Sequence, residues 1–118
     1  MTTKAQWRVA LAVAATLLAG ATTPKSLNPA NEKLLKLQPA EQAAELARAV
    51  GHWCIGTEAF PMGVVAAAGP GEGNAYWSLR CTDGSAWAIQ IDPLGEYTAI
   101  ECAIFKANGA GKECFQKL

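Results

Sequence analysis

Four cysteines constrain the fold of this chain more than any other feature of its sequence. They are Cys54, Cys81, Cys102 and Cys114, and their successive separations of 27, 21 and 12 residues include no Cys-x-x-Cys pair. Structural zinc sites and thioredoxin-like redox sites use such a pair, so we expect neither a metal site nor redox chemistry. An even number of cysteines in a short exported chain favours two disulfides. The sequence therefore predicts a small domain held by two covalent cross-links.

The N-terminus predicts that the chain is exported. Lys4 and Arg8 give a basic start without an acidic residue. Residues 9–18 consist of valine, leucine and alanine with a single threonine. Small residues at Ala19-Gly20-Ala21 then provide a cleavage site. This order is the three-part pattern of a secretory signal peptide.

A membrane anchor is the alternative interpretation of this N-terminus. The apolar stretch from Val9 to Ala19 is 11 residues long, whereas a membrane-spanning helix needs about 20. No cysteine before Cys54 could accept a lipid. We therefore expect residues 1–21 to be a cleaved signal peptide, residues 22–27 a flexible leader, and residues 28–118 one domain in the periplasm or outside the cell.

The charge of the mature chain excludes one class of partner. Removal of Lys4 and Arg8 leaves eight basic and ten acidic side chains. Binding to nucleic acid or to anionic lipid requires clustered positive charge, which this balance does not supply. We expect no nucleic-acid partner and no stable membrane anchor after cleavage.

Two helices are predicted before residue 51. Asn28 can cap the first, Pro29 suits its first turn, and Pro39 ends it. Pro39 also begins the second helix, which Gly51 stops. Each helix has one apolar stripe, formed by Leu34, Leu35 and Leu37 in the first and by Ala43, Leu46, Ala47 and Val50 in the second.

A β-meander is predicted between residues 75 and 105. A three-residue loop, Thr82-Asp83-Gly84, places Leu79 opposite Trp87, whereas a two-residue turn would set polar residues opposite apolar ones. The third strand turns back around residues 92–96, with Ile100 opposite Ile89. The inward residues of the three strands are Trp77, Leu79 and Cys81, then Trp87, Ile89 and Ile91, then Thr98, Ile100, Cys102 and Ile104.

This register favours one disulfide connectivity. Cys102 lies opposite Trp87, so Cys81 and Cys102 stand on strands separated by a central one, about 9–10 Å apart. Disulfides do not span that distance. We therefore favour Cys54 with Cys81 and Cys102 with Cys114, while the other pairings stay open.

The remaining segments are less regular. Residues 54–63 have no assignable pattern, residues 64–68 fit a strand, and residues 69–74 form a glycine-rich loop. A turn is predicted at residues 107–111, after which residues 112–118 could form a last strand at the edge of the sheet. Helices followed by a meander indicate an α+β fold, in which one or two N-terminal helices pack on a small antiparallel sheet stapled by disulfides.

Candidate catalytic groups are few. His52 is the single histidine, so a small envelope hydrolase would use it with a nearby carboxylate such as Glu58. Asp83 and Asp92 fall at predicted turns, which explains them without catalysis. The Gly-x-Gly in residues 69–73 is not followed by a helix pattern, as a phosphate-binding loop would require. We expect no cofactor.

The outer face of the predicted meander is the candidate binding surface. In the predicted register its centre consists of small side chains, Ala86, Ala88, Ala99 and Ala103. A flat surface of this kind could receive a partner chain with few side chains to order. Its rim consists of Tyr76, Arg80, Gln90, Tyr97, Glu101 and Phe105.

The C-terminal third carries a recognisable pattern, Tyr76-Trp77-Ser78-Leu79-Arg80-Cys81-Thr82-Asp83-Gly84, then Ile91-Asp92-Pro93-x-Gly95, then Cys102 and Cys114-Phe115. It resembles a group of uncharacterised small exported bacterial proteins. The resemblance implies a periplasmic or secreted disulfide domain and no known activity. We therefore expect a non-enzymatic module that binds another envelope or secreted protein, with a small hydrolase or a purely structural envelope protein as alternatives.

Overall fold

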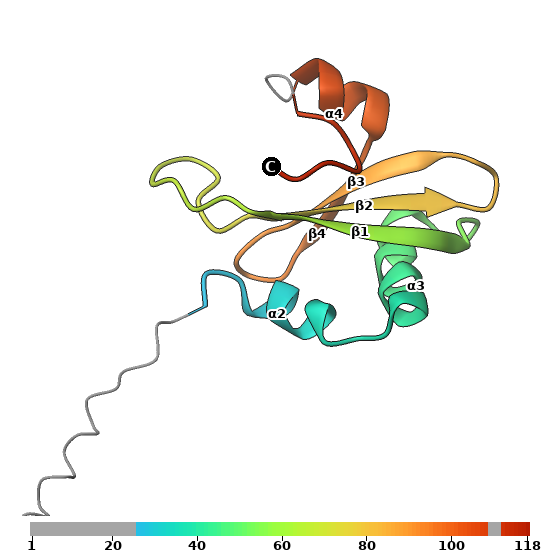
Figure 1. Cartoon of the computed structure of the whole chain (residues 1–118), viewed down its shortest axis with the longest axis horizontal. Coiled ribbons are helices and arrows are strands. Elements are labelled where there is room, and N and C mark those ends of the chain that lie inside the picture. The colour runs from blue at the N-terminus through green and yellow to red at the C-terminus, as the bar shows by residue number, and fades with distance from the viewer. Residues whose placement is uncertain (1–25, 109–111) are drawn as a thin grey trace, which may run out of the picture.

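The fold is that of the predicted α+β class. The computed structural model describes residues 26–108 and 112–118, so the predicted signal peptide lies outside the described residues. Four antiparallel strands form one sheet in the order β1-β2-β3-β4 (Figure 1). The elements are, in chain order, α2 (Pro29–Leu35), α3 (Pro39–Val50), β1 (Gly56–Val64), β2 (Ala75–Cys81), β3 (Ala86–Ile91), β4 (Tyr97–Glu101) and α4 (Cys102–Asn108).

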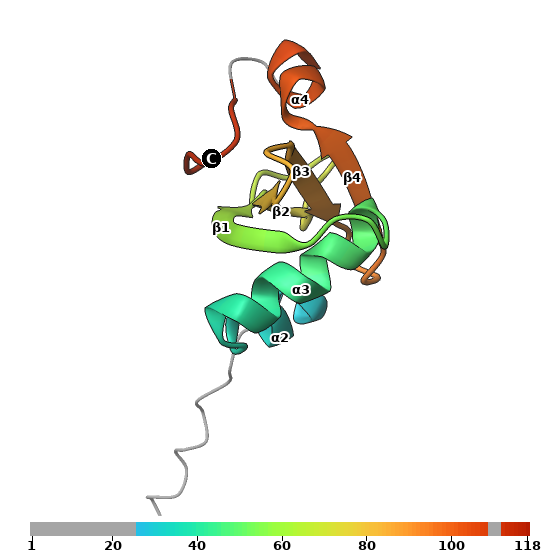
Figure 2. The same cartoon turned by 90° about the vertical axis from the view of Figure 1, so that its right-hand side faces the viewer.

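The sheet is covered on both faces. Helices α2 and α3 lie against one face, and α4 with the C-terminal residues 112–118 lies against the other (Figures 1 and 2). The larger core, under α2 and α3, is built around Trp77, Leu79 and Leu46, which are all fully buried. A smaller cluster of Met62, Ala88 and Phe105 lies on the α4 side. The molecule therefore has three layers.

A buried asparagine fastens α2 to the sheet. The Asn28 side chain accepts a hydrogen bond from the Asn31 backbone N–H at 3.0 Å and thereby caps the helix. Its amide nitrogen donates to the carbonyl oxygens of Gly73 and Ile91, each at 2.8 Å. Asn31 in turn accepts a hydrogen bond of 2.7 Å from the Trp77 indole. Both side-chain polar atoms of Asn28, the Asn31 Oδ1 atom and the Trp77 indole N–H are therefore paired, as is usual for buried polar groups.

Replacing Asn28 with alanine is expected to lower the free energy of unfolding by about 1–3 kcal/mol, because the helix loses its cap and two buried carbonyls lose their donor. Urea unfolding followed by circular dichroism measures this loss. Lys36→Ala is the matched control, since Lys36 is an exposed residue at the other end of the same helix. Equal unfolding midpoints for the two variants would contradict the assigned role of Asn28.

Helix α3 lies close to the start of β1. It begins at Pro39, where Gln38 and Glu41 form a capping box, and its buried residues are Ala43, Leu46 and Ala47. A Cβ atom added at Gly56 would come within 2.5 Å of the Ala43 carbonyl oxygen. The small residues of this helix and Gly56 thus allow the backbones of the helix and the strand to approach each other.

The predicted hairpin between β2 and β3 is confirmed. Leu79 lies opposite Trp87 and Trp77 lies opposite Ile89. The Cys81 N–H donates to the Ser85 carbonyl, so the connecting loop is Thr82-Asp83-Gly84 as predicted, and Gly84 has φ +89°. Only glycine adopts this left-handed conformation readily.

The predicted register of the third strand is wrong by one residue. Ile89 lies opposite Ala99 and not Ile100, and Trp87 lies opposite Glu101 and not Cys102. The loop after β3 is Pro93-Leu94-Gly95, closed by a hydrogen bond from the Asp92 N–H to the Glu96 carbonyl. A loop of this length keeps odd-numbered residues on the core face, so Tyr97 and Ala99 pack against the core under α3. Ile104 lies on helix α4 and not on a strand.

The irregular segments also differ from expectation. Residues 56–64 form a strand with two register shifts, whereas no structure was predicted for residues 54–63. The predicted strand over residues 64–68 is wrong, because β1 ends at Val64 and a loop follows. Residues 112–118 form no edge strand but lie across the α4 side of the sheet, where the Leu118 N–H donates to the Met62 carbonyl. The predicted turn at residues 107–111 lies partly outside the described residues, and α4 continues to Asn108.

The favoured disulfide pairing is confirmed. Cys54 is bonded to Cys81 with a Cα–Cα distance of 5.3 Å, and Cys102 is bonded to Cys114 at 5.8 Å. The pairing is correct although the β4 register used to derive it was not. The first bond joins the segment after α3 to the end of β2, and the second joins the start of α4 to the C-terminal residues. Each bond therefore fastens one of the two covering layers.

Candidate functional site

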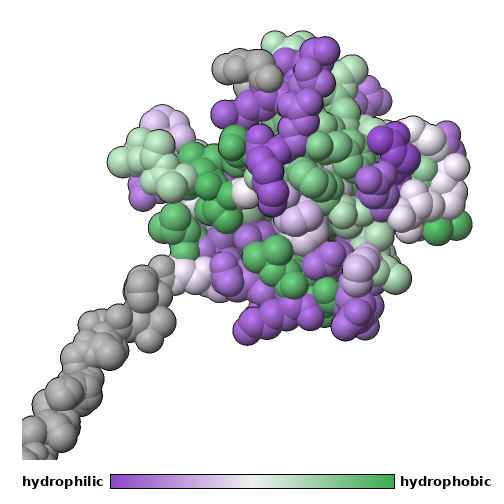
Figure 3. Space-filling model, in the orientation of Figure 1, coloured by the Kyte–Doolittle hydropathy of each residue, from purple (hydrophilic) through white to green (hydrophobic). Residues whose placement is uncertain are grey.

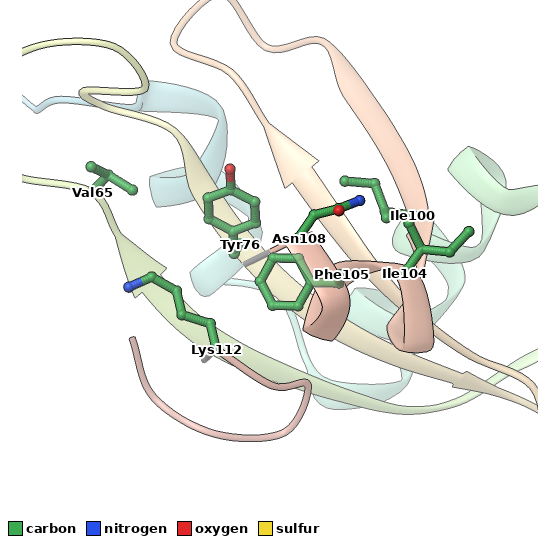
Figure 4. A pocket seen from close by; sticks show the side chains of 7 residues that line it. All are labelled: Val65, Tyr76, Ile100, Ile104, Phe105, Asn108 and Lys112. Atoms are coloured by element: carbon green, nitrogen blue, oxygen red, sulfur yellow. The ribbon is translucent and has the colours of Figure 1, made fainter. Parts of the chain in front are cut away.

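A depression in the described residues lies between α4 and the sheet. It has a volume of about 400 Å³, within the usual range of small-molecule sites. Figure 4 shows that its side chains come from the sheet, from α4 and from the segments beside them. They are Val65, Tyr76, Ile100, Ile104, Phe105, Asn108 and Lys112. We call this depression the α4 cavity.

Sheet register and helix geometry together place the walls of the α4 cavity. Tyr76 pairs with Gln90, and Ile100 pairs with Ala88, so Tyr76 and Ile100 project from the same face of the sheet. Phe105 projects from α4, and its ring centroid lies 5.6 Å from that of Tyr76. Phe105 is 7 % exposed whereas Ile104 is 49 % exposed. One residue therefore anchors the helix, while its neighbour lines the open side.

The interior of the α4 cavity offers few polar partners. The Tyr76 hydroxyl donates to Gln90 Oε1 at 2.8 Å, so this donor is already used. The remaining polar side chains of the lining, Asn108 and Lys112, belong to exposed residues. Figure 3 shows hydrophobic surface between the projecting β1–β2 loop and the C-terminal segment. The arrangement favours binding of an apolar group over acid–base chemistry.

The predicted binding residues do not form one surface. Tyr76, Arg80 and Gln90 lie on the α4 side of the sheet, whereas Tyr97 and Glu101 lie on the α3 side. The one-residue register error in β4 produced the false grouping. The expected alanine platform is not open either, because Ala88 is fully buried.

Arg80 is engaged within the molecule. Its Nε lies 3.4 Å from the Glu58 carboxylate, and its guanidinium lies 4.7 Å from the centroid of the Phe115 ring. Phe115 in turn donates its backbone N–H to the buried Ser78 hydroxyl at 2.7 Å. These contacts hold the C-terminal segment over β1 and β2, so Arg80 has a structural explanation.

Tyr97 occupies a half-buried position beside α3. Burial raises the pKa of its phenol above the ordinary value, the Glu45 carboxylate raises it further, and the Arg48 guanidinium lowers it. The neutral phenol is therefore the form that suits the fold. Its ring packs against the core under α3, so we assign it a structural role.

The residues of the hydrolase hypothesis do not form a recognisable constellation. His52 is exposed at the end of α3 and lines a shallow depression with Arg48 and Ile55. Glu58 pairs with Arg80. In the part of the chain that the structure describes, no hydrogen bond joins His52 to a nucleophile or to a carboxylate. Catalysis through His52 stays a hypothesis without geometric support.

The turn carboxylates have structural explanations. Asp83 accepts hydrogen bonds from the Ser85 hydroxyl at 2.7 Å and from the Ser85 N–H at 2.9 Å, and these bonds lower its pKa. Asp92 accepts the backbone N–H groups of Leu94 and Glu96. Within residues 26–108 and 112–118, no group of three or more side chains could hold a metal ion. None of the described helices has the length and apolar character to cross a membrane.

Comparison with known proteins gives no further assignment, since no family model, curated protein or solved structure matches this chain. The resemblance to small exported bacterial proteins therefore stays a prediction. Sequence reasoning included Tyr76 and Phe105 in the binding surface, assigned Ile100 and Ile104 to the inward face of the sheet, and missed Val65, Asn108 and Lys112. Their positions depend on how α4 and the C-terminal segment fold over the sheet. The one local signal was the helix-forming composition of residues 103–107.

Proposed function

We propose that the protein is an exported, non-enzymatic binding module that receives an apolar group of another envelope or secreted molecule in the α4 cavity. The observation that carries this proposal is the cavity itself. Its walls are mainly apolar, and Ile104 remains half-exposed beside it. An apolar group that enters such a cavity gains free energy by leaving water.

Two other features support the proposal. The N-terminal sequence has the pattern of a signal peptide, and two disulfides are compatible with an oxidising compartment. The Cys102–Cys114 bond also fixes the start of α4, which limits the conformational entropy that the cavity wall loses on binding.

Binding of an uncharged fluorescent probe, N-phenyl-1-naphthylamine, to the oxidised mature protein tests this function. We expect the probe to bind, and Ile104→Glu to weaken its binding about tenfold or more, because the variant places a carboxylate in an apolar wall. The half-exposed position of Ile104 should let the variant fold. Fluorescence titration gives both dissociation constants.

Ala107→Glu is the matched control, because it adds the same charge to an exposed position of α4 that does not line the cavity. Far-ultraviolet circular dichroism of both variants reports whether they fold. If the probe bound folded Ile104→Glu and the natural protein equally well, the α4 cavity would not be the binding site.

A further inference from the structure

The one charged residue that lines the α4 cavity stands at one end of the lining (Figure 4). The apolar part consists of two aromatic rings and three aliphatic side chains from the sheet, α4 and the loop that follows β1. The polar groups are the Lys112 ammonium, on the Val65 side of Phe105, and the Asn108 carboxamide, which points toward Ile100 on the other side (Figure 4). Both belong to exposed residues, so the polar groups stand at the solvent side. A ligand that matches this arrangement has an apolar body and a polar end.

The charge at the solvent side selects the sign of that polar end. No carboxylate of the described residues lies within ion-pair distance of Lys112, whereas the neighbouring Lys106 is 3.6 Å from Glu113. The lining contains no acidic residue. An anionic group at the Lys112 end would therefore meet an unneutralised ammonium, whereas a cationic group there would meet repulsion.

We propose that the α4 cavity binds an anionic single-chain amphiphile, that is, an alkyl chain ending in a carboxylate or a similar anion. The chain lies against Tyr76, Ile100 and Phe105, and the headgroup lies beside Lys112. This inference rests on the proposed function and adds the chemical class of the ligand. The buried chain supplies affinity, and the single charge supplies selectivity.

Displacement of N-phenyl-1-naphthylamine by matched ten-carbon compounds tests the headgroup. Below their micelle-forming concentrations, decanoate is expected to displace the probe at lower concentration than decyltrimethylammonium. Hexanoate, octanoate and decanoate should show an affinity that rises about threefold to fourfold per methylene group, as burial of the chain requires. Equal displacement by the anionic and the cationic compound would overturn the proposal.

Lys112→Gln tests the assigned cation. We expect decanoate binding to weaken about twofold to fivefold, as for a solvent-exposed charge pair, while binding of the uncharged probe stays the same. Lys36→Gln is the matched control, because it removes the same charge from α2 in the opposite layer. Equal decanoate affinity of Lys112→Gln and the natural protein would also overturn the proposal.

The two proposals fail in different ways. If the probe binds and Ile104→Glu abolishes its binding, but decanoate does not displace it, the ligand class is wrong and the binding function stands. If the probe binds neither protein, the binding function is wrong and the ligand class falls with it.

Discussion

Replacing Trp77 with alanine is expected to lower the free energy of unfolding by about 3–5 kcal/mol, the usual loss for a large aromatic side chain removed from a core. Trp77 is fully buried at the centre of β2 and lies opposite Ile89. Its indole N–H also donates to Asn31 at 2.7 Å. Alanine would leave a cavity under α2 and deprive Asn31 of its donor.

Denaturant unfolding measured by tryptophan fluorescence and circular dichroism tests this prediction. Trp53→Ala is the matched control, since Trp53 is 50 % exposed and its loss should cost much less. Trp77→Phe separates the two contributions, because phenylalanine fills part of the volume but cannot donate to Asn31. The two alanine variants should therefore differ clearly in their free energies of unfolding. If these free energies differed by less than about 1 kcal/mol, the usual effect of a single mutation, Trp77 would not be central to the core.

Removing the Cys54–Cys81 bond by Cys54→Ala with Cys81→Ala is expected to lower the free energy of unfolding by about 3–4 kcal/mol. The bond closes 27 residues, and both cysteines are buried. In the chain-entropy account the Cys102–Cys114 bond, which closes 12 residues, contributes about 0.7 kcal/mol less. Double substitutions are needed because a single one leaves a reactive thiol.

The two double variants should differ in function as well as in stability. Loss of the Cys102–Cys114 bond frees the start of α4 and should weaken probe binding. The Cys54–Cys81 bond lies away from the α4 cavity, so its loss should leave probe binding unchanged in the folded protein. Chemical unfolding and probe titration of both variants provide the comparison. If probe binding weakened more on removal of the Cys54–Cys81 bond than on removal of the Cys102–Cys114 bond, the assignment of one bond to each layer would be refuted.

The parts of the fold that were predicted correctly have strong local signals. Asn28 with Pro29 begins α2, and Pro39 with Gly51 bounds α3, as expected, although α2 ends at Leu35, before Pro39. The hairpin between β2 and β3 follows from alternating apolar residues and from Gly84, which permits a three-residue loop. These signals lie within short stretches of sequence, so they can be interpreted without knowledge of the tertiary structure.

The errors occur where packing between distant parts of the chain determines the secondary structure or the strand register. In β1, register shifts on both sides of residues 58–61 and a proline at Pro61 break the alternation that indicates a strand. In β4, alternation from Thr98 to Ile104 suggested one long strand, but the loop at residues 93–95 sets the opposite face inward and the chain enters α4 at Cys102. The face of a strand depends on the parity of the preceding loop.

The candidate site was predicted only in part for the same reason. Tyr76 was correctly placed on the side of the sheet away from α3. Tyr97 and Glu101 were grouped with it because the β4 register was wrong by one residue. The cavity arises because α4 covers this side of the sheet, and no pattern within β2 or β4 indicates that cover.

The order of the two disulfides along the chain has a consequence for biogenesis. Each cysteine is bonded to its neighbour in sequence, so the two covalent loops neither overlap nor enclose one another. If the chain crosses a membrane N-terminus first, an oxidant that joins cysteines in their order of emergence will form the native pairs directly. Maturation would then require thiol oxidation but no isomerase to rearrange mispaired intermediates.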